Sequence, residues 1–376
     1  MTEARSARQL ATTASNGEPS AAFNNAEFGV DLCPLFGRVQ HMEAHRRQFG
    51  PGGYAARIVR ATIRDTGLLI EQATEAGAKR LPDSGVTALD TWMRGHPNAA
   101  FLYGGIFGQN LETTERMLGA CSDIAESIAL LLDTNGRVLA SPFVLERALG
   151  EAIMRLCYIF DHSAPPARTI GRMAAYQLES IEGNLRAAEA FGIQGAEKAV
   201  RARENIAEMH GWLNENGFEL FADRREPFTV SLAIDGHREN IKFDATAAFK
   251  RYLPASAWQW ELGSGVTHSR GWMLAGLLAT SETEALTSPT EVAMAVAGSS
   301  LELGDALARA AHGHTGAEVT WYLAKNHQRR RGITSWSGMH QELAVDHTEY
   351  AKRGPNWKNR EGHLGASFQR PPSASN

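Results

Sequence analysis

Apolar residues recur at helical spacing along most of this chain of 376 residues. They lie three or four positions apart, so each segment presents one apolar stripe. Pro142 and Gly217 lie where such stripes begin and end. Helices are expected at 58–76, 112–132, 142–160, 166–191, 195–216, 244–253, 256–280, 289–311 and 315–331. The pattern predicts a mainly α fold, a multi-helix bundle-like domain, because no repeat or heptad array is visible.

Residues 228–243 break the helical pattern. Apolar residues flank Asp235-Gly236, a dipeptide typical of two-residue hairpin turns. A turn at that position pairs Val230 with Ile241 across two antiparallel strands. The sequence therefore predicts one small β-hairpin inserted among the helices.

The two ends of the chain differ in composition from its centre. Residues 1–27 and 351–376 are rich in Ser, Asn, Pro and Gly, so we expect a disordered N-terminal tail and a basic flexible tail. The helical domain is expected to cover 28–350. Within it, residues 81–110 contain turn signals such as Pro82-Asp-Ser-Gly85 and are expected to be a connector.

Composition and cysteine usage favour a cytoplasmic protein. Hydrophobic residues make up 43% and charged residues 21%, which is ordinary for a soluble chain. No apolar run approaches the ~18 residues that a membrane span needs, so no membrane association is expected. Cys33, Cys121 and Cys157 are too few and too scattered for a disulfide framework or a zinc site, and the last two are expected in the core.

No motif in the chain names a reaction. A Walker A loop, a Gly-x-Ser-x-Gly elbow, a His-Glu-x-x-His zinc motif and a kinase signature are all absent from the sequence. Five histidines gather near the C-terminus: His312, His314, His327, His340 and His347. Because their spacing follows no ligand pattern, we expect surface histidines and neither a metal nor another cofactor.

Two helical segments each place polar residues in an apolar pattern. Arg147 and Glu151 lie four positions apart, as do Ser264 and His268, so each pair shares a helix face. Such groups are costly to bury unpaired, which predicts that Arg147, Glu151 and His268 converge. These four residues are the candidate catalytic set. The competing interpretation is an intrahelical Arg–Glu ion pair and a histidine packed in the core.

The same two segments resemble a family of all-helical bacterial proteins without an established activity. The family is similar in its Arg-x-x-x-Glu helix, here Arg147 to Glu151, and in its later Ser-x-x-x-His helix, here Ser264 to His268. The resemblance covers about residues 110–280 and implies a relation to the HEPN superfamily of helical ribonucleases. The Arg203-to-His210 spacing also resembles the HEPN pattern, in which both residues act on a phosphodiester.

The segment 325–331 concentrates positive charge. It contains Lys325, Arg329, Arg330 and Arg331, and three consecutive arginines cannot all face the core. We therefore expect an exposed electrostatic contact for a polyanion or nucleic acid. A solvated helix end is the competing interpretation.

Three function classes stay open. The absence of motifs favours a non-catalytic scaffold or partner-binding protein, and a homo-oligomer is one form that it could take. The resemblance favours a HEPN-like ribonuclease or defence protein. A specialised biosynthetic enzyme with an apolar pocket is the third class, and its wall would be formed by the aromatic residues Trp258, Trp260, Trp272, Trp321 and Tyr322.

Overall fold

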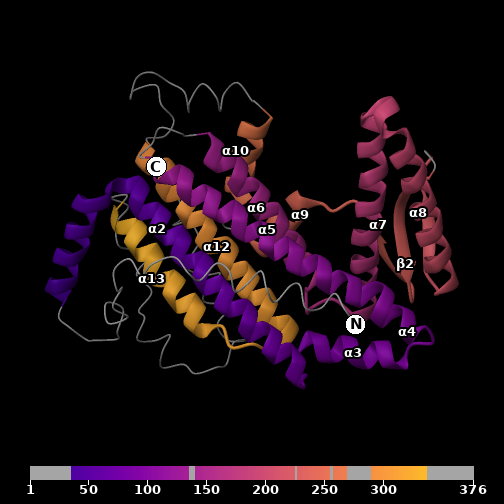
Figure 1. Ribbon diagram of the computed structural model, residues 1–376. Coiled ribbons are helices and arrows are strands. Elements are labelled where there is room, and N and C mark those ends of the chain that lie inside the picture. Colours follow the sequence, from indigo (N-terminus) through magenta and orange to yellow (C-terminus); the bar gives the residue numbers. More distant parts are fainter. Residues whose placement is uncertain (1–34, 135–139, 225–226, 255–256, 269–288, 337–376) are drawn as a thin grey trace, which may run out of the picture. The chain divides into compact units, whose positions relative to one another are not determined.

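The computed structural model describes residues 35–134, 140–224, 227–254, 257–268 and 289–336. The fold is mainly α, as predicted (Figure 1). The chain divides into two compact units, 1–48 and 49–376, and every contact below lies within the second. The predicted tails, 1–27 and 351–376, lie outside the described residues.

The described elements follow one another along the chain. The helices are α2 (Leu35–Lys79), α3 (Gly85–Gly95), α4 (Ala99–Phe101), the π-helix η2 (Leu102–Gly108), α5 (Gln109–Leu132), α6 (Ser141–Ile159), α7 (Pro166–Ala190), the 3₁₀ helix η3 (Gly192–Gly195), α8 (Ala196–Glu215), α9 (Ala245–Tyr252), α10 (Ala257–Thr267), α12 (Pro289–Thr315) and α13 (Thr320–Trp336). The strands are β1 (Glu219–Ala222), β2 (Thr229–Ile234) and β3 (His237–Asn240). No helix in the described part of the chain is both long enough and apolar enough to cross a membrane.

Helix α2 is interrupted at Gly50. This glycine has φ 65° and ψ 174°, a conformation outside the helical region, and Pro51 follows it. A glycine tolerates positive φ without steric cost, and a proline at the start of a helix needs no hydrogen-bond partner for its nitrogen. The sequence predicted the helix beyond this break.

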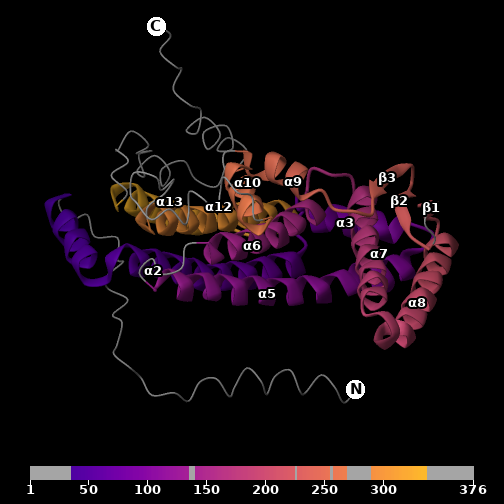
Figure 2. The same cartoon turned by 90° about the horizontal axis from the view of Figure 1, so that it is seen from above.

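The larger core lies among α2, α5, α6 and α12. Figures 1 and 2 show α5, α6 and α12 side by side. Their apolar stripes meet in a cluster that includes Ile128, Phe143, Met154, Ala297 and Leu301, together with Cys121 and Cys157 as expected. Because α6 is covered on several sides, a charge on its buried face is costly unless it is paired or neutralised.

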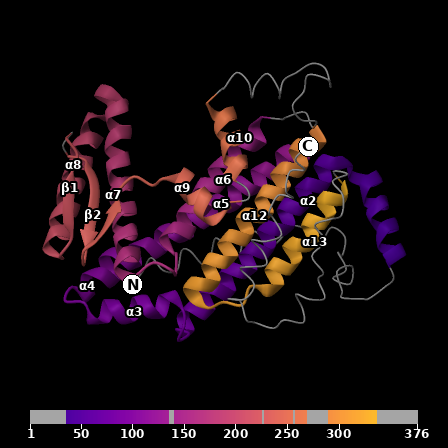
Figure 3. The ribbon, with the colours of Figure 1, turned by 180° about the vertical axis from the view of Figure 1, so that it is seen from behind.

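A second core joins α3, η2, α7 and α8 to the three-stranded sheet. In Figure 3 the sheet lies beside α7 and α8. Met93, Ile106, Ile170, Leu213 and Leu232 belong to this cluster. Its helices therefore bury one face each against the strands and against one another.

The predicted hairpin is confirmed in position and register. Strands β2 and β3 pair antiparallel around Asp235-Gly236, and the amide of Ile241 donates to the carbonyl of Val230 at 3.0 Å. Strand β1, which pairs with β2, was not predicted. The hairpin is thus part of a three-stranded sheet in the described chain.

The expectation of a connector at residues 81–110 is wrong. Helix α3 begins there because the Ser84 side chain accepts a hydrogen bond from the amide of Thr87, at 3.4 Å, and so caps the helix. Val86, Leu89 and Met93 bury one face of this helix. The turn signals of residues 82–85 mark the start of a helix and not a long loop.

Candidate functional site

Arg147 on α6 and His268 at the end of α10 lie in contact. Nη1 of Arg147 is 3.3 Å from Nε2 of His268, and the contact is exposed. The guanidinium carbon also lies 4.6 Å from the ring centroid of Trp260. The predicted convergence is therefore confirmed for Arg147 and His268.

Gly263 permits this close approach of α10 to α6. A Cβ atom at Gly263 would lie 2.9 Å from Cβ of Arg147 and 3.0 Å from the carbonyl oxygen of Phe143. Trp260, one turn earlier, is 6% exposed and stacks on Phe249 of α9 at 4.7 Å. A small residue and a buried aromatic residue thus hold α10 against α6 and fix the position of Arg147.

The other two members of the predicted set lie near this pair without a described contact to its side chains. No hydrogen bond or ion pair among the described residues joins Glu151 to Arg147 or His268. The backbone carbonyl of Ser264 accepts a hydrogen bond of 3.0 Å from the backbone amide of His268, as within a helical turn. The described convergence is thus limited to Arg147 and His268.

The geometry fixes which groups donate. A guanidinium can only donate hydrogen bonds, so Nε2 of His268 accepts from Arg147. An imidazole that accepts a hydrogen bond at Nε2 is the tautomer with its proton on Nδ1. The guanidinium of half-buried Arg147 can bind an oxyanion, and an imidazole in this tautomer can accept a proton at Nε2.

The side chains of the basic segment 325–331 form ion pairs with carboxylates that we did not expect from the sequence. Lys325 Nζ lies 3.1 Å from Oδ1 of Asp65, and Arg329 forms an ion pair with the other oxygen of the same carboxylate. Arg330 pairs with Asp305 at 2.6 Å. The side chains of Arg329 and Arg330 are only 15% and 22% exposed.

The expectation of an exposed contact is therefore wrong for Arg329 and Arg330, which connect α13 to α2 and α12. Their partners Asp65 and Asp305 are buried acids that need a cation. Arg331 is exposed, as expected. Polyanion binding through this segment stays a prediction.

The histidines near the C-terminus differ in environment. His314 is 9% exposed and its ring lies 4.7 Å from that of Phe160, so the expectation of a surface position is wrong for this residue. Burial, and then the charge of nearby His162, lowers the pKa of His314 to about 4. Among the described residues, no group of three or more potential ligands could hold a metal. His340 and His347 lie outside the described residues.

The second HEPN-like spacing does not form a pair. Arg203 forms an ion pair with Glu189 of α7, whereas Nε2 of His210 lies 3.0 Å from Oγ1 of Thr229 on β2. The two side chains thus have separate partners, one on α7 and one on β2.

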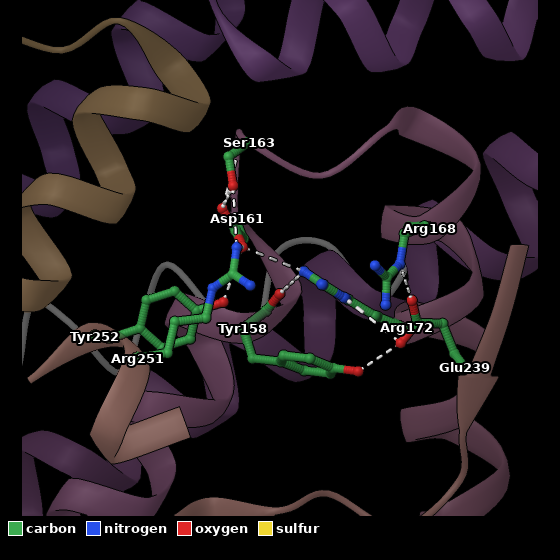
Figure 4. Close-up of polar contacts among 8 residues, drawn as sticks. All are labelled: Tyr158, Asp161, Ser163, Arg168, Arg172, Glu239, Arg251 and Tyr252. Carbon is green, nitrogen blue, oxygen red and sulfur yellow. Dashed lines mark hydrogen bonds and ion pairs between the residues drawn. The ribbon is translucent and has the colours of Figure 1, made fainter. Parts of the chain in front are cut away.

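A buried network of arginines and carboxylates was missed by sequence analysis. Figure 4 shows Arg172 between Asp161 and Glu239, with each carboxylate 3.7 Å from a guanidinium nitrogen. Arg168 adds an ion pair to Glu239, and Arg251 adds one to Asp161 at 2.7 Å. The network connects the end of α6 with α7, β3 and α9.

Two tyrosines and a serine complete this network. Tyr158 donates to Glu239 at 2.6 Å, and Tyr252 donates to Asp161 at 2.9 Å (Figure 4). Burial, followed by the contact with Glu239, raises the pKa of Tyr158 to about 12. Burial alone would raise the pKa of Asp161, but hydrogen bonds from Ser163 and Tyr252 hold it below its usual range. Both carboxylates are therefore well supplied with donors, which is the pattern of a structural network.

No family model matches the chain, and no curated protein or solved structure matches it.

Proposed function

We propose that the protein binds phosphate-bearing ligands at Arg147 and His268 and acts as a HEPN-like ribonuclease. The observation that carries the proposal is the exposed 3.3 Å contact between these two side chains. Arg147 faces an imidazole and a tryptophan ring, with no described carboxylate partner. A guanidinium placed in this way keeps its charge available for a phosphate.

The chemistry requires a cation and a proton acceptor near one phosphodiester. When a phosphate takes the guanidinium of Arg147, Nε2 of His268 is released from its hydrogen bond. The imidazole then accepts at Nε2 the proton of an RNA 2′-hydroxyl, the group that distinguishes RNA from DNA. The 2′-oxygen forms a bond to the adjacent phosphorus, the bond from phosphorus to the 5′-oxygen of the next nucleotide breaks, and the imidazolium returns its proton to that leaving oxygen, which leaves a 2′,3′-cyclic phosphate. Arg147 stabilises the negative charge that develops on the phosphate. This proposal places the protein in the cytoplasm, with exposed Arg331 as a further contact for the RNA backbone.

Cleavage of labelled single-stranded RNA tests the proposal. His268→Ala is expected to abolish cleavage, whereas His210→Ala is expected to retain it, because His210 contacts Thr229 and lies outside the pair. A DNA strand of the same sequence should resist cleavage. Loss of activity in the His210 variant alone would move the site to α8, and no cleavage by the unaltered protein would refute the proposal.

A partner-binding scaffold is the second candidate, and one surface feature favours it. Phe191 and Ile193, in the turn between α7 and α8, are 68% and 96% exposed. Adjacent exposed apolar side chains are typical of protein contacts. If a second copy of the chain covers them, Ile193→Asp should convert a dimer to a monomer in sedimentation equilibrium. A protein that is monomeric at all concentrations would refute this candidate.

A further inference from the structure

A glutamate inside the larger core is not explained by any function above. Glu146 on α6 is 2% exposed, although its neighbour Arg147 reaches the surface. Ser299 of α12 donates a hydrogen bond to Oε1 of Glu146. Its other oxygen, Oε2, is buried and has no hydrogen-bond partner in the described structure.

A second acid, the half-buried Glu302 of α12, acts on the same region. Oε2 of Glu302 is also buried without a described hydrogen bond. Burial, and then the charge of Glu302, raises the pKa of Glu146 to about 7, against the effect of Ser299. An ionised Glu146 would therefore be an unpaired charge in an apolar core, next to a like charge.

Glu302 has charged neighbours of both signs. Burial raises the pKa of Glu302, Arg330 of α13 lowers it, Asp305 raises it, and Arg309 of α12 lowers it. Among the charged residues of α12, Glu302 is the one that shifts the pKa of Glu146. The described residues of α5, α7, α9 and α10 bring no charge that shifts Glu146. Among the residues that the structure describes, no cation thus offsets the charge of an ionised Glu146.

We propose that the contact between α6 and α12 is a pH-sensitive element. Glu146 is protonated while the two helices pack, and its ionisation loosens their packing. Figures 1 and 2 show these two helices packed side by side. Because α6 also carries Arg147, which follows Glu146 in the sequence, this element is next to the Arg–His pair. The proposal concerns folding and does not depend on ribonuclease activity.

The sign of the effect follows from the protons bound. Between the ordinary value of 4.5 and about 7, the folded protein holds a proton on Glu146 that the unfolded chain has lost. The stabilising contribution of Glu146 is therefore full at pH values below this window and is lost as pH rises through it. Other groups also titrate in this pH range, so the informative quantity is the difference in stability between two proteins that share those groups.

Glu146→Gln supplies that difference, because glutamine keeps the shape and cannot ionise. We expect the folding equilibrium constant of the variant, relative to the unaltered protein, to rise about tenfold per pH unit from about pH 5 to 7. Ser300→Ala, a buried change on α12 that removes no titratable group, is the matched control and should give a ratio that is constant with pH. A constant ratio for Glu146→Gln would overturn the proposal.

Two further measurements decide the matter even if Glu146→Gln fails to fold. Infrared spectra of the unaltered protein at pH 6 should contain a carboxylic-acid band that disappears as pH rises above 7. Ser299→Ala removes the donor to the ionised form, so the midpoint of that change should move to higher pH. A missing band at pH 6, or a midpoint that Ser299→Ala leaves in place, would contradict the proposal.

Discussion

Nη1 of Arg147 lies 3.3 Å from Nε2 of His268, although 121 residues separate them in the sequence. The two residues come from different helices, and Gly263 allows those helices to approach closely. An exposed Arg–His contact adds little to stability, because a guanidinium gains more from a carboxylate. The proposed function assigns this contact to the binding of a ligand.

Gly263→Ala should destabilise the packing of α10 on α6. The added Cβ would lie 2.9 Å from Cβ of Arg147, so one helix must shift, at a cost of about 1–3 kcal/mol. Gly119→Ala on α5 is the matched control, since its Cβ would meet nothing within 4 Å and alanine favours a helix. Urea unfolding should show opposite changes in the two variants, and a neutral Gly263→Ala would contradict the described packing.

Arg172→Ala should be among the most destabilising changes of a charged residue. It removes the central cation between Asp161 and Glu239, both nearly fully buried, and the loss is about 3 kcal/mol. Arg116→Ala removes an exposed ion pair with Glu112 and should cost less than about 0.5 kcal/mol. Equal losses in thermal unfolding would show that the network of Figure 4 is not formed.

Two adjacent arginines on α13 should behave differently. Arg330→Ala leaves Asp305 buried without its ion-pair partner and should cost about 3 kcal/mol of unfolding free energy. Arg331→Ala, at an exposed position, should change it by less than about 0.5 kcal/mol. Chemical denaturation of the two variants is the measurement, and the reverse order of stabilities would contradict the assigned helix faces.

The stability of the protein should fall in acid because of His314. Its folded pKa of about 4 lies below the ordinary 6.5, so the unfolded chain binds more protons in this window and stability is lost as pH falls from 6.5 to 4. His314→Gln cannot titrate, and its stability relative to the unaltered protein should rise toward low pH. An acid dependence of stability that His314→Gln leaves unchanged would place His314 in solvent.

The sequence predicted most helices because each carries an apolar stripe. It missed α3, where the signals of a turn and of an N-cap are the same residues, Pro82 to Gly85. It missed β1 because four residues are too few for an alternating pattern to be recognised. Local spacing predicts a helix or a strand only when the element is long enough for its apolar pattern to repeat.

The candidate site was predicted only in part, for a different reason. Helical spacing places Glu146 and Glu151 on α6, but it does not reveal which one faces α12. Likewise, the partners of Arg172 come from β3 and from the end of α6, far apart in sequence. Side-chain pairing across segments depends on packing, which local spacing does not encode.

The most direct test of the proposed function is a double-mutant cycle on Arg147 and His268, with the rate of RNA cleavage as the readout. If the two side chains act as one unit, Arg147→Ala, His268→Ala and the double variant should all lose activity to a similar extent, so the effects are strongly non-additive. Circular dichroism should show all three variants folded. Cleavage at the unaltered rate by the folded double variant, or losses that simply add, would contradict the account.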